Sequence, residues 1–158
     1  MTTAQAAASD REVDILGKPY VLAKFTGREW GVFDSWMAGQ ILSRTRAAVA
    51  EIQEPEPFIS AAVALAARID SRMCADPAVR EVITALWNST DGQAMHASLL
   101  LRKSFPKPSR EQIAGMLEDP EWASAYYAAT ADYLAVPSKK KDVELPESPV
   151  VPVISTAA

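Results

Sequence analysis

The chain has a single cysteine, Cys74, and a single histidine, His96. One cysteine excludes an intramolecular disulfide and fits a reducing compartment. A structural zinc site needs four ligands of the Cys and His type, which two residues cannot complete. Because spacing alone does not make a nucleophile and base pair, the simpler interpretation is a helix-end cysteine and a histidine on a helix surface. The sequence therefore predicts no metal site, no catalytic residues and no enzymatic activity.

Glycine and long apolar runs are also scarce. The chain has six glycines, and Gly27, Gly31 and Gly39 are scattered singles that form no phosphate-binding loop. The most apolar window, residues 59–67, is far shorter than a membrane span. The first ten residues lack the basic and apolar segments of a signal peptide. We therefore expect a soluble, cytoplasmic protein that needs no cofactor and binds no membrane.

Positive charge is in deficit, because the formal net charge is -4 with both signs interspersed. Nucleic-acid binding usually requires a basic face. The one cationic run, Lys139–Lys141, is followed at once by Asp142 and Glu144. We expect no nucleic-acid partner, and we interpret the lysine run as a solvated segment with weak electrostatic docking as the alternative.

The first recognisable elements are two short strands. Val13 and Ile15 alternate with charged neighbours, as in a half-buried strand. Leu16–Pro19 is typical of a turn, and Tyr20–Phe25 predicts a second strand. Since a lone hairpin is barely stable in water, we expect it to pack on the helices that follow.

A long helix is predicted next. Thr26–Glu29 has the pattern of a capping box, in which the threonine hydroxyl accepts from an N3 amide and Glu29 returns the bond. The helix is expected to run to about Ile52 and to end before Glu54–Pro57, because proline disfavours helix in the preceding residue. Apolar residues at steps of three and four form its inward stripe: Trp30, Phe33, Met37 and Ile41.

Caps and prolines divide the remainder into shorter helices. One helix is expected over residues 58–73, and the next begins at Asp76-Pro77. A third follows a capping box at 90–93, and two more follow caps at Ser109 and Asp119. Residues 105–108 are an extended break. The inward residues are expected to be Phe58, Ala62, Leu65, Ala66, Ile69, Val79, Val82, Ile83, Leu86, Met95, Leu99, Leu101, Ile113, Met116, Leu117, Trp122, Tyr126, Ala129 and Tyr133.

These patterns predict a mainly α fold with a minor β part. A short N-terminal hairpin precedes a bundle of five to six helices, forming one domain over residues 11–136. Residues 1–10 are small and polar and are expected to be flexible. Residues 137–158 contain four prolines and the lysine run, a composition typical of a disordered tail.

Two aromatic residues lie off the main apolar stripes of their helices. They are Trp36 and Tyr127. Aromatic residues in exposed positions are favoured at protein contacts. The alternative is that a second layer of helices covers them. Trp36 and Tyr127 are therefore the candidate partner-binding residues.

The order of the parts resembles the tail assembly chaperones of long-tailed bacteriophages and related prophages. In that family a hairpin with a Gly-Lys/Arg-x-Tyr turn leads into a Thr-capped helix, as in Gly17–Tyr20 and Phe25–Glu29. The family's later segment, a helix followed by proline and a Ser/Thr-capped helix, is matched by Leu99–Ser104, Phe105–Pro108 and Ser109–Ile113.

The resemblance spans residues 12–136, and it departs from the family pattern at Pro19, where many relatives have a free amide. It implies a non-enzymatic assembly factor in the host cytoplasm, absent from the mature virion. Such a factor binds the tape measure protein and keeps it soluble while the tail tube polymerises. The tail tube protein is a second expected partner. Relatives often make a second, longer product by ribosomal frameshift, and a slippery codon run at Lys139–Lys141 is the hypothesis for this chain. A homo-oligomer is a further partner that the sequence leaves open.

Two other classes fit a small helical protein. A head-tail connector or tail completion protein would form rings and remain in purified particles. A small helical regulatory protein would carry a basic recognition helix, which the acidic net charge disfavours.

Overall fold

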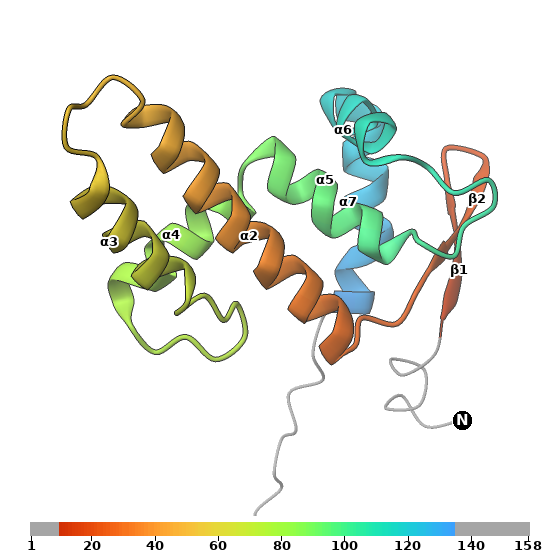
Figure 1. The fold of residues 1–158 in the computed structure, drawn as a ribbon. Helices are drawn as coiled ribbons and strands as arrows, with labels where there is room; N and C mark the ends of the chain where they lie inside the picture. The colour runs from red at the N-terminus through yellow and green to blue at the C-terminus, as the bar shows by residue number, and fades with distance from the viewer. Residues whose placement is uncertain (1–9, 135–158) are drawn as a thin grey trace, which may run out of the picture.

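The computed structural model describes residues 10–134 of the chain. Within them lie six helices and one antiparallel hairpin, which confirms the mainly α fold (Figure 1). The predicted tail at 137–158 and the predicted flexible residues 1–9 lie outside the described part. The elements are β1 Arg11–Ile15, β2 Lys18–Leu22, α2 Gly27–Ala48, α3 Glu56–Ala66, α4 Pro77–Trp87, α5 Thr90–Leu100, α6 Arg110–Glu118 and α7 Pro120–Leu134.

The hairpin turn is tighter than the sequence predicted. Only Leu16 and Gly17 lie between the strands, and both have positive φ, 52° and 76°. Pro19 therefore belongs to β2, where it faces Asp14. Pairs alternate between bonded and non-bonded along such a ladder, and the pair that closes a two-residue turn is bonded. Pro19 consequently occupies a non-bonded position and costs the hairpin no hydrogen bond.

Helix α2 begins as predicted and ends earlier than predicted. The Thr26 capping box is present. The Thr26 side chain accepts hydrogen bonds from backbone amides of the first turn, and the Glu29 carboxylate accepts one from the Thr26 amide at 2.9 Å. The helix ends at Ala48 instead of near Ile52. Its chain continues in a turn in which the Ile52 amide donates to the Val49 carbonyl at 3.0 Å.

Helix α3 is also shorter than predicted and ends at Ala66. The cause is side-chain competition for the following amides. The Asp70 carboxylate accepts from the amides of Arg72 and Met73, both at 3.0 Å, and Asp34 of α2 accepts from the Ser71 amide at 3.1 Å. Aspartate side chains that bond nearby amides favour a turn over a helix. Residues 67–76 thus form a loop that is held against α2.

The later caps follow the sequence closely, with one correction. Asp76 and Ser109 cap α4 and α6, and Asp119 accepts from the Glu121 amide at 3.0 Å at the start of α7. The predicted capping box at 90–93 is displaced by one residue, because the cap of α5 is Ser89, whose Oγ accepts from the Gly92 amide at 3.1 Å.

Gly92, in the first turn of α5, lies against the backbone at the end of α4. A Cβ atom at this position would overlap the carbonyl oxygen of Leu86 and lie 2.9 Å from that of Trp87. We therefore expect Gly92→Ala to lower the free energy of unfolding by about 1–3 kcal/mol, because backbone atoms have to move. Urea denaturation would measure the loss. Gly31→Ala is the control, since open space surrounds that position and alanine there avoids the entropic cost of a helical glycine. Equal stability of the two variants would contradict the close approach.

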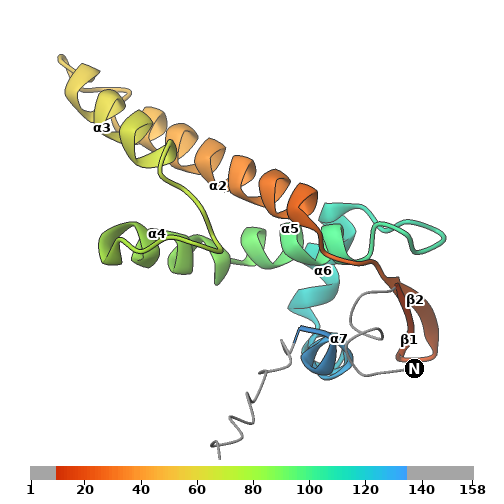
Figure 2. The same cartoon turned by 90° about the horizontal axis from the view of Figure 1, so that it is seen from below.

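The core consists of two clusters. One joins the hairpin to α5, α6 and α7 and contains Ile15, Tyr20, Leu22, Ala94, Ala97, Leu100, Leu101, Ile113, Trp122 and Tyr126. The other joins α2, α3 and α4 and contains Phe33, Met37, Ile41, Ala62, Val79, Ile83 and Leu86. Helix α5 supplies residues to both, because Met95 and Leu99 pack against the second. Figures 1 and 2 show that α3 lies at one end of the molecule and the hairpin at the other.

Candidate partner-binding surface

Trp36, one of the two predicted contact residues, packs mostly inward. Its ring stacks on Phe33 of the same helix, with centroids 5.7 Å apart and an interplanar angle of 13°. The side chain is half-buried against the second core cluster. Its indole N–H is buried and has no hydrogen-bond acceptor among the described residues. Trp36 therefore serves mainly to pack α2 against the second core cluster, and little of its ring is available to a partner.

Tyr127, the other predicted contact residue, is accessible. It lies on α7 with 46% of its surface exposed, and its hydroxyl donates to Gln93 Oε1 of α5 at 2.6 Å. Its ring also meets Tyr126 edge-on at 5.5 Å. Since Trp36 packs with the α2 cluster and Tyr127 lies on α7, the structure does not gather the two residues into one site.

Among the described residues, α3 has an apolar surface that its neighbours leave uncovered. From Phe58 to Ala66 the only polar residue is Ser60, so the helix is apolar all round. A helix of that kind is normally buried on all sides. Here α3 packs along α2 and leaves Phe58 and Val63 53% and 51% exposed. Phe58 was predicted to face inward, and this prediction is wrong because α2 covers only one side of α3.

We call residues 41–66 the arm, because α3 and the second half of α2 extend together away from the hairpin (Figures 1 and 2). A groove of about 350 Å³ runs between the two helices of the arm. No charged side chain lines this arm groove. Its lining residues are Ile41, Thr45, Ala48, Val49, Phe58, Ala61, Ala62 and Leu65.

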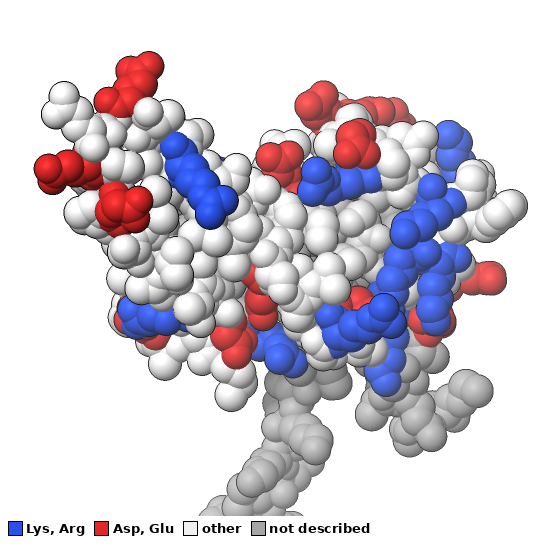
Figure 3. All heavy atoms as spheres, viewed as in Figure 1, with Lys and Arg blue, Asp and Glu red and all other residues white. Residues whose placement is uncertain are grey.

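The tip of the arm is acidic. Residues 47–67 include Glu51, Glu54 and Glu56 but neither lysine nor arginine. All three glutamates are exposed. Figure 3 shows acidic side chains gathered at the end of the arm and most basic ones toward the hairpin end. The arm therefore offers an apolar groove with a negative tip, while Arg44 and Arg46 are exposed farther back along α2.

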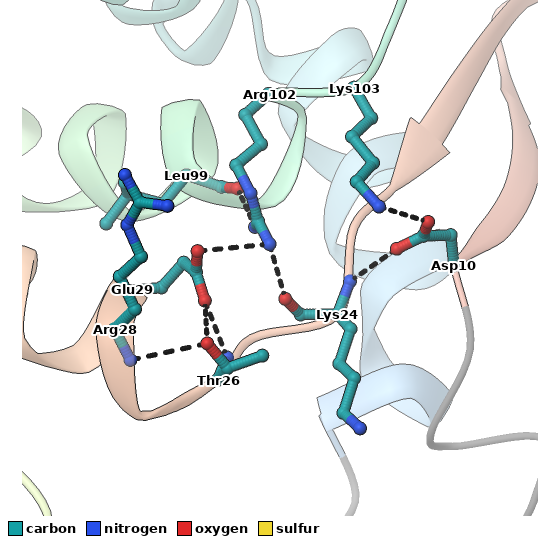
Figure 4. A network of polar contacts seen from close by, with 8 residues as sticks. All are labelled: Asp10, Lys24, Thr26, Arg28, Glu29, Leu99, Arg102 and Lys103. Carbon is teal, nitrogen blue, oxygen red and sulfur yellow. Dashed lines mark hydrogen bonds and ion pairs between the residues drawn. The ribbon is translucent and has the colours of Figure 1, made fainter.

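A network of polar contacts at the start of α2 has a structural role (Figure 4). Arg102 donates to the carbonyl oxygens of Leu99 and Lys24, both at 2.7 Å, and its guanidinium lies 3.2 Å from Glu29. The hydroxyl of Thr26 is the main cause of the lowered pKa of Glu29. The network joins the chain between β2 and α2 to the end of α5.

Asp10 extends the same network to the first described residue. Its carboxylate accepts from the Lys24 amide at 2.9 Å and from Lys103 Nζ at 2.6 Å. The bond from Lys103 is the main cause of the lowered pKa of Asp10. Asp10 falls within the stretch that was expected to be flexible, and these bonds attach it to the hairpin end of the fold.

His96 is buried, so its predicted position on a helix surface is wrong. It is 7% exposed, and its ring lies 4.8 Å from Trp87, 5.0 Å from Phe25 and 5.8 Å from Phe33. Burial lowers the pKa of His96 to about 4. The aromatic neighbours come from the β2–α2 linker, α2 and α4. The apolar pattern of α5 alone does not show that these residues cover His96.

Cys74 lies in the loop before α4, not at the end of a longer α3. Its thiol is half-buried and points to the Asp76 carbonyl oxygen, at 3.7 Å. Within residues 10–134 no group of three or more His, Cys, Asp or Glu side chains is placed to hold a metal ion. Over the same residues, no helix combines the length and apolarity needed to cross a bilayer.

Comparisons of the chain with protein-family models, curated proteins and solved structures found no match. The function proposed below therefore rests on the motif order in the sequence and on the surface of the arm.

Proposed function

We propose that this chain is a tail assembly chaperone of a long-tailed bacteriophage or prophage. In this proposal it binds the tape measure protein in the host cytoplasm, keeps it soluble while the tail tube polymerises, and is absent from the finished virion. The motif order supports the family. The unpartnered apolar arm supports a function in binding another protein.

The arm suits a helical partner. Amphipathic helices commonly bind by laying an apolar face into a hydrophobic groove. The arm groove is lined without charge, and the exposed face of α3 continues it. An exposed apolar surface of this kind on a soluble protein typically marks a contact site. The resemblance implies that the tape measure protein is long and rich in helix. Its apolar helical stripes would be shielded from water by binding to the arm.

Phe58 is the expected anchor of the contact. It lines the arm groove and is half exposed in the free chain, so a partner buries the remainder of its ring. Aromatic residues that become fully covered at the centre of an interface often contribute 2 kcal/mol or more. Tyr127 is a second accessible aromatic residue, on a different helix, and we propose it as a peripheral contact.

Co-expression with the accompanying tape measure protein tests the function. We expect the two chains to elute together in size-exclusion chromatography, and the long partner to be soluble only when this chain is present. A tape measure protein that precipitates regardless would refute the proposal. Recovery of this chain from purified virions would instead favour a head-tail connector or tail completion protein.

A substitution at Phe58 tests the surface. We expect Phe58→Ser to weaken binding of a tape measure fragment on the order of 30-fold, since that ratio corresponds to about 2 kcal/mol. Isothermal titration calorimetry would measure the affinity. The control is Met73→Ser, which removes a large apolar side chain that is 78% exposed in the loop before α4. Equal affinities of the two variants would show that the partner does not bind at the arm.

A further inference from the structure

A free arm leaves apolar surface in water, and the opposite end of the molecule has a surface that complements it. A groove runs between the hairpin, α6 and the loop at 105–108. It consists of two adjoining hollows of about 570 and 340 Å³ that share Lys18, Tyr20, Gln112 and Met116. We call it the hairpin groove.

The hairpin groove is apolar and partly aromatic. Tyr20 and Trp122 meet edge-on in its wall, with centroids 6.3 Å apart. Phe105 stands at its margin and is 95% exposed. Leu16 lines the other margin, half exposed at a turn position with φ of 52°, where glycine, asparagine or aspartate is usual. Both margins thus hold large apolar side chains in water.

The margin of the hairpin groove is also basic. Residues 101–110 include Arg102, Lys103, Lys107 and Arg110 but neither aspartate nor glutamate. Arg102 forms an ion pair with Glu29, and Lys103 forms one with Asp10. Lys18 and Lys107 line the groove and enter no ion pair among residues 10–134. Asp119 lines the same hollow as Lys18, so the groove lining has two cationic side chains and one carboxylate. The excess positive charge is available to an acidic occupant.

We propose that the hairpin groove binds the arm of a second copy of this chain. The arm brings exposed Phe58 and Ile52 to an apolar, aromatic groove. It also brings Glu51 and Glu54 to the margin that holds Lys18 and Lys107. Because the two surfaces lie at opposite ends of the molecule (Figures 1 and 2), the contact is heterologous, and repeating it gives a ring or a filament.

This self-association uses the arm that the proposed function assigns to the tape measure protein. It covers the apolar face of α3 until a helical partner displaces the second copy. The test requires only this chain, so a failure here leaves the solubility test of the proposed function unaffected.

Charge reversal at each surface provides the experiment. The arm variant is Glu51→Lys with Glu54→Lys, and the groove variant is Lys18→Glu with Lys107→Glu. Sedimentation velocity at low salt would measure the assembly of each. We expect the wild-type chain to grow beyond a dimer with concentration, and each variant alone to associate on the order of 100-fold more weakly, because like charges then face one another. A 1:1 mixture of the variants is expected to assemble again, since each arm finds a groove of opposite sign.

A control separates local from net charge. The arm variant has a net charge of -4 + 4 = 0, which by itself promotes association. Glu81→Lys with Asp91→Lys has the same net charge, at exposed positions that line neither groove, and should assemble like the wild type. The proposal is overturned if the wild-type chain stays monomeric at all concentrations, or if the groove variant assembles as well as the wild type. It is also overturned if the mixture assembles no better than its parts.

Discussion

Replacing Phe33 with alanine is expected to lower the free energy of unfolding by about 3–5 kcal/mol. Phe33 is fully buried in the second core cluster. Its ring meets Trp87 edge-on at 4.7 Å and stacks on Trp36. It also lies 5.8 Å from the His96 ring, so α2, α4 and α5 all lose contacts when it is truncated. Aromatic pairs add stability beyond the area that they bury.

Urea denaturation followed by circular dichroism measures this loss. The control is Val32→Ala, the neighbouring residue on α2, which is 42% exposed and should change the stability by less than about 0.5 kcal/mol. A loss below about 1 kcal/mol for Phe33→Ala would show that the aromatic cluster does not join the three helices.

Acid is expected to destabilise the fold through His96. Burial lowers the pKa of His96 from 6.5 to about 4. Below pH 6.5 the unfolded chain therefore binds a proton at this residue that the folded chain does not bind. The free energy of unfolding falls as the pH is lowered from 6.5 to about 4 and then levels off for this group. The limiting loss is about 3 kcal/mol, since each pH unit of separation corresponds to about 1.4 kcal/mol.

His96→Leu isolates this contribution. We expect the variant to lose most of the pH dependence of stability between pH 6.5 and 4, whatever its stability at pH 7. The carboxylates of Asp10, Glu29 and Asp76 have lowered pKa values, mainly from hydrogen bonds, so they stabilise the fold above their ordinary pKa and that stability is lost toward lower pH. They are unchanged in the variant. A slope that persists in His96→Leu would assign the acid sensitivity to these carboxylates.

Local signals in the sequence were enough to place most element starts. Thr26, Asp76 and Ser109 each bond the amides that their helix leaves free, and this chemistry is decided within four residues. The inward stripe of α2 was also predictable, because Phe33, Met37 and Ile41 follow the helical period and are buried.

The features that the sequence did not predict depend on contacts between residues far apart in the chain. His96 is buried because Phe25 and Trp87, from different segments, enclose it. Helix α3 ends early because Asp34, 37 residues before Ser71, holds that amide. The exposure of Phe58 arises because, among residues 10–134, α3 packs mainly along α2. Helical periodicity does not indicate how many faces of a helix its neighbours cover.

Hydrogen–deuterium exchange on the complex with a tape measure fragment is the most direct test of the arm as the binding surface. The free chain is measured at a concentration where it is monomeric, so that a second copy does not cover the arm. The amides of α3 are expected to exchange more slowly in the complex than in the free chain, while those of the hairpin remain unchanged. A complex in which α3 exchanges as it does in the free chain would contradict the central claim.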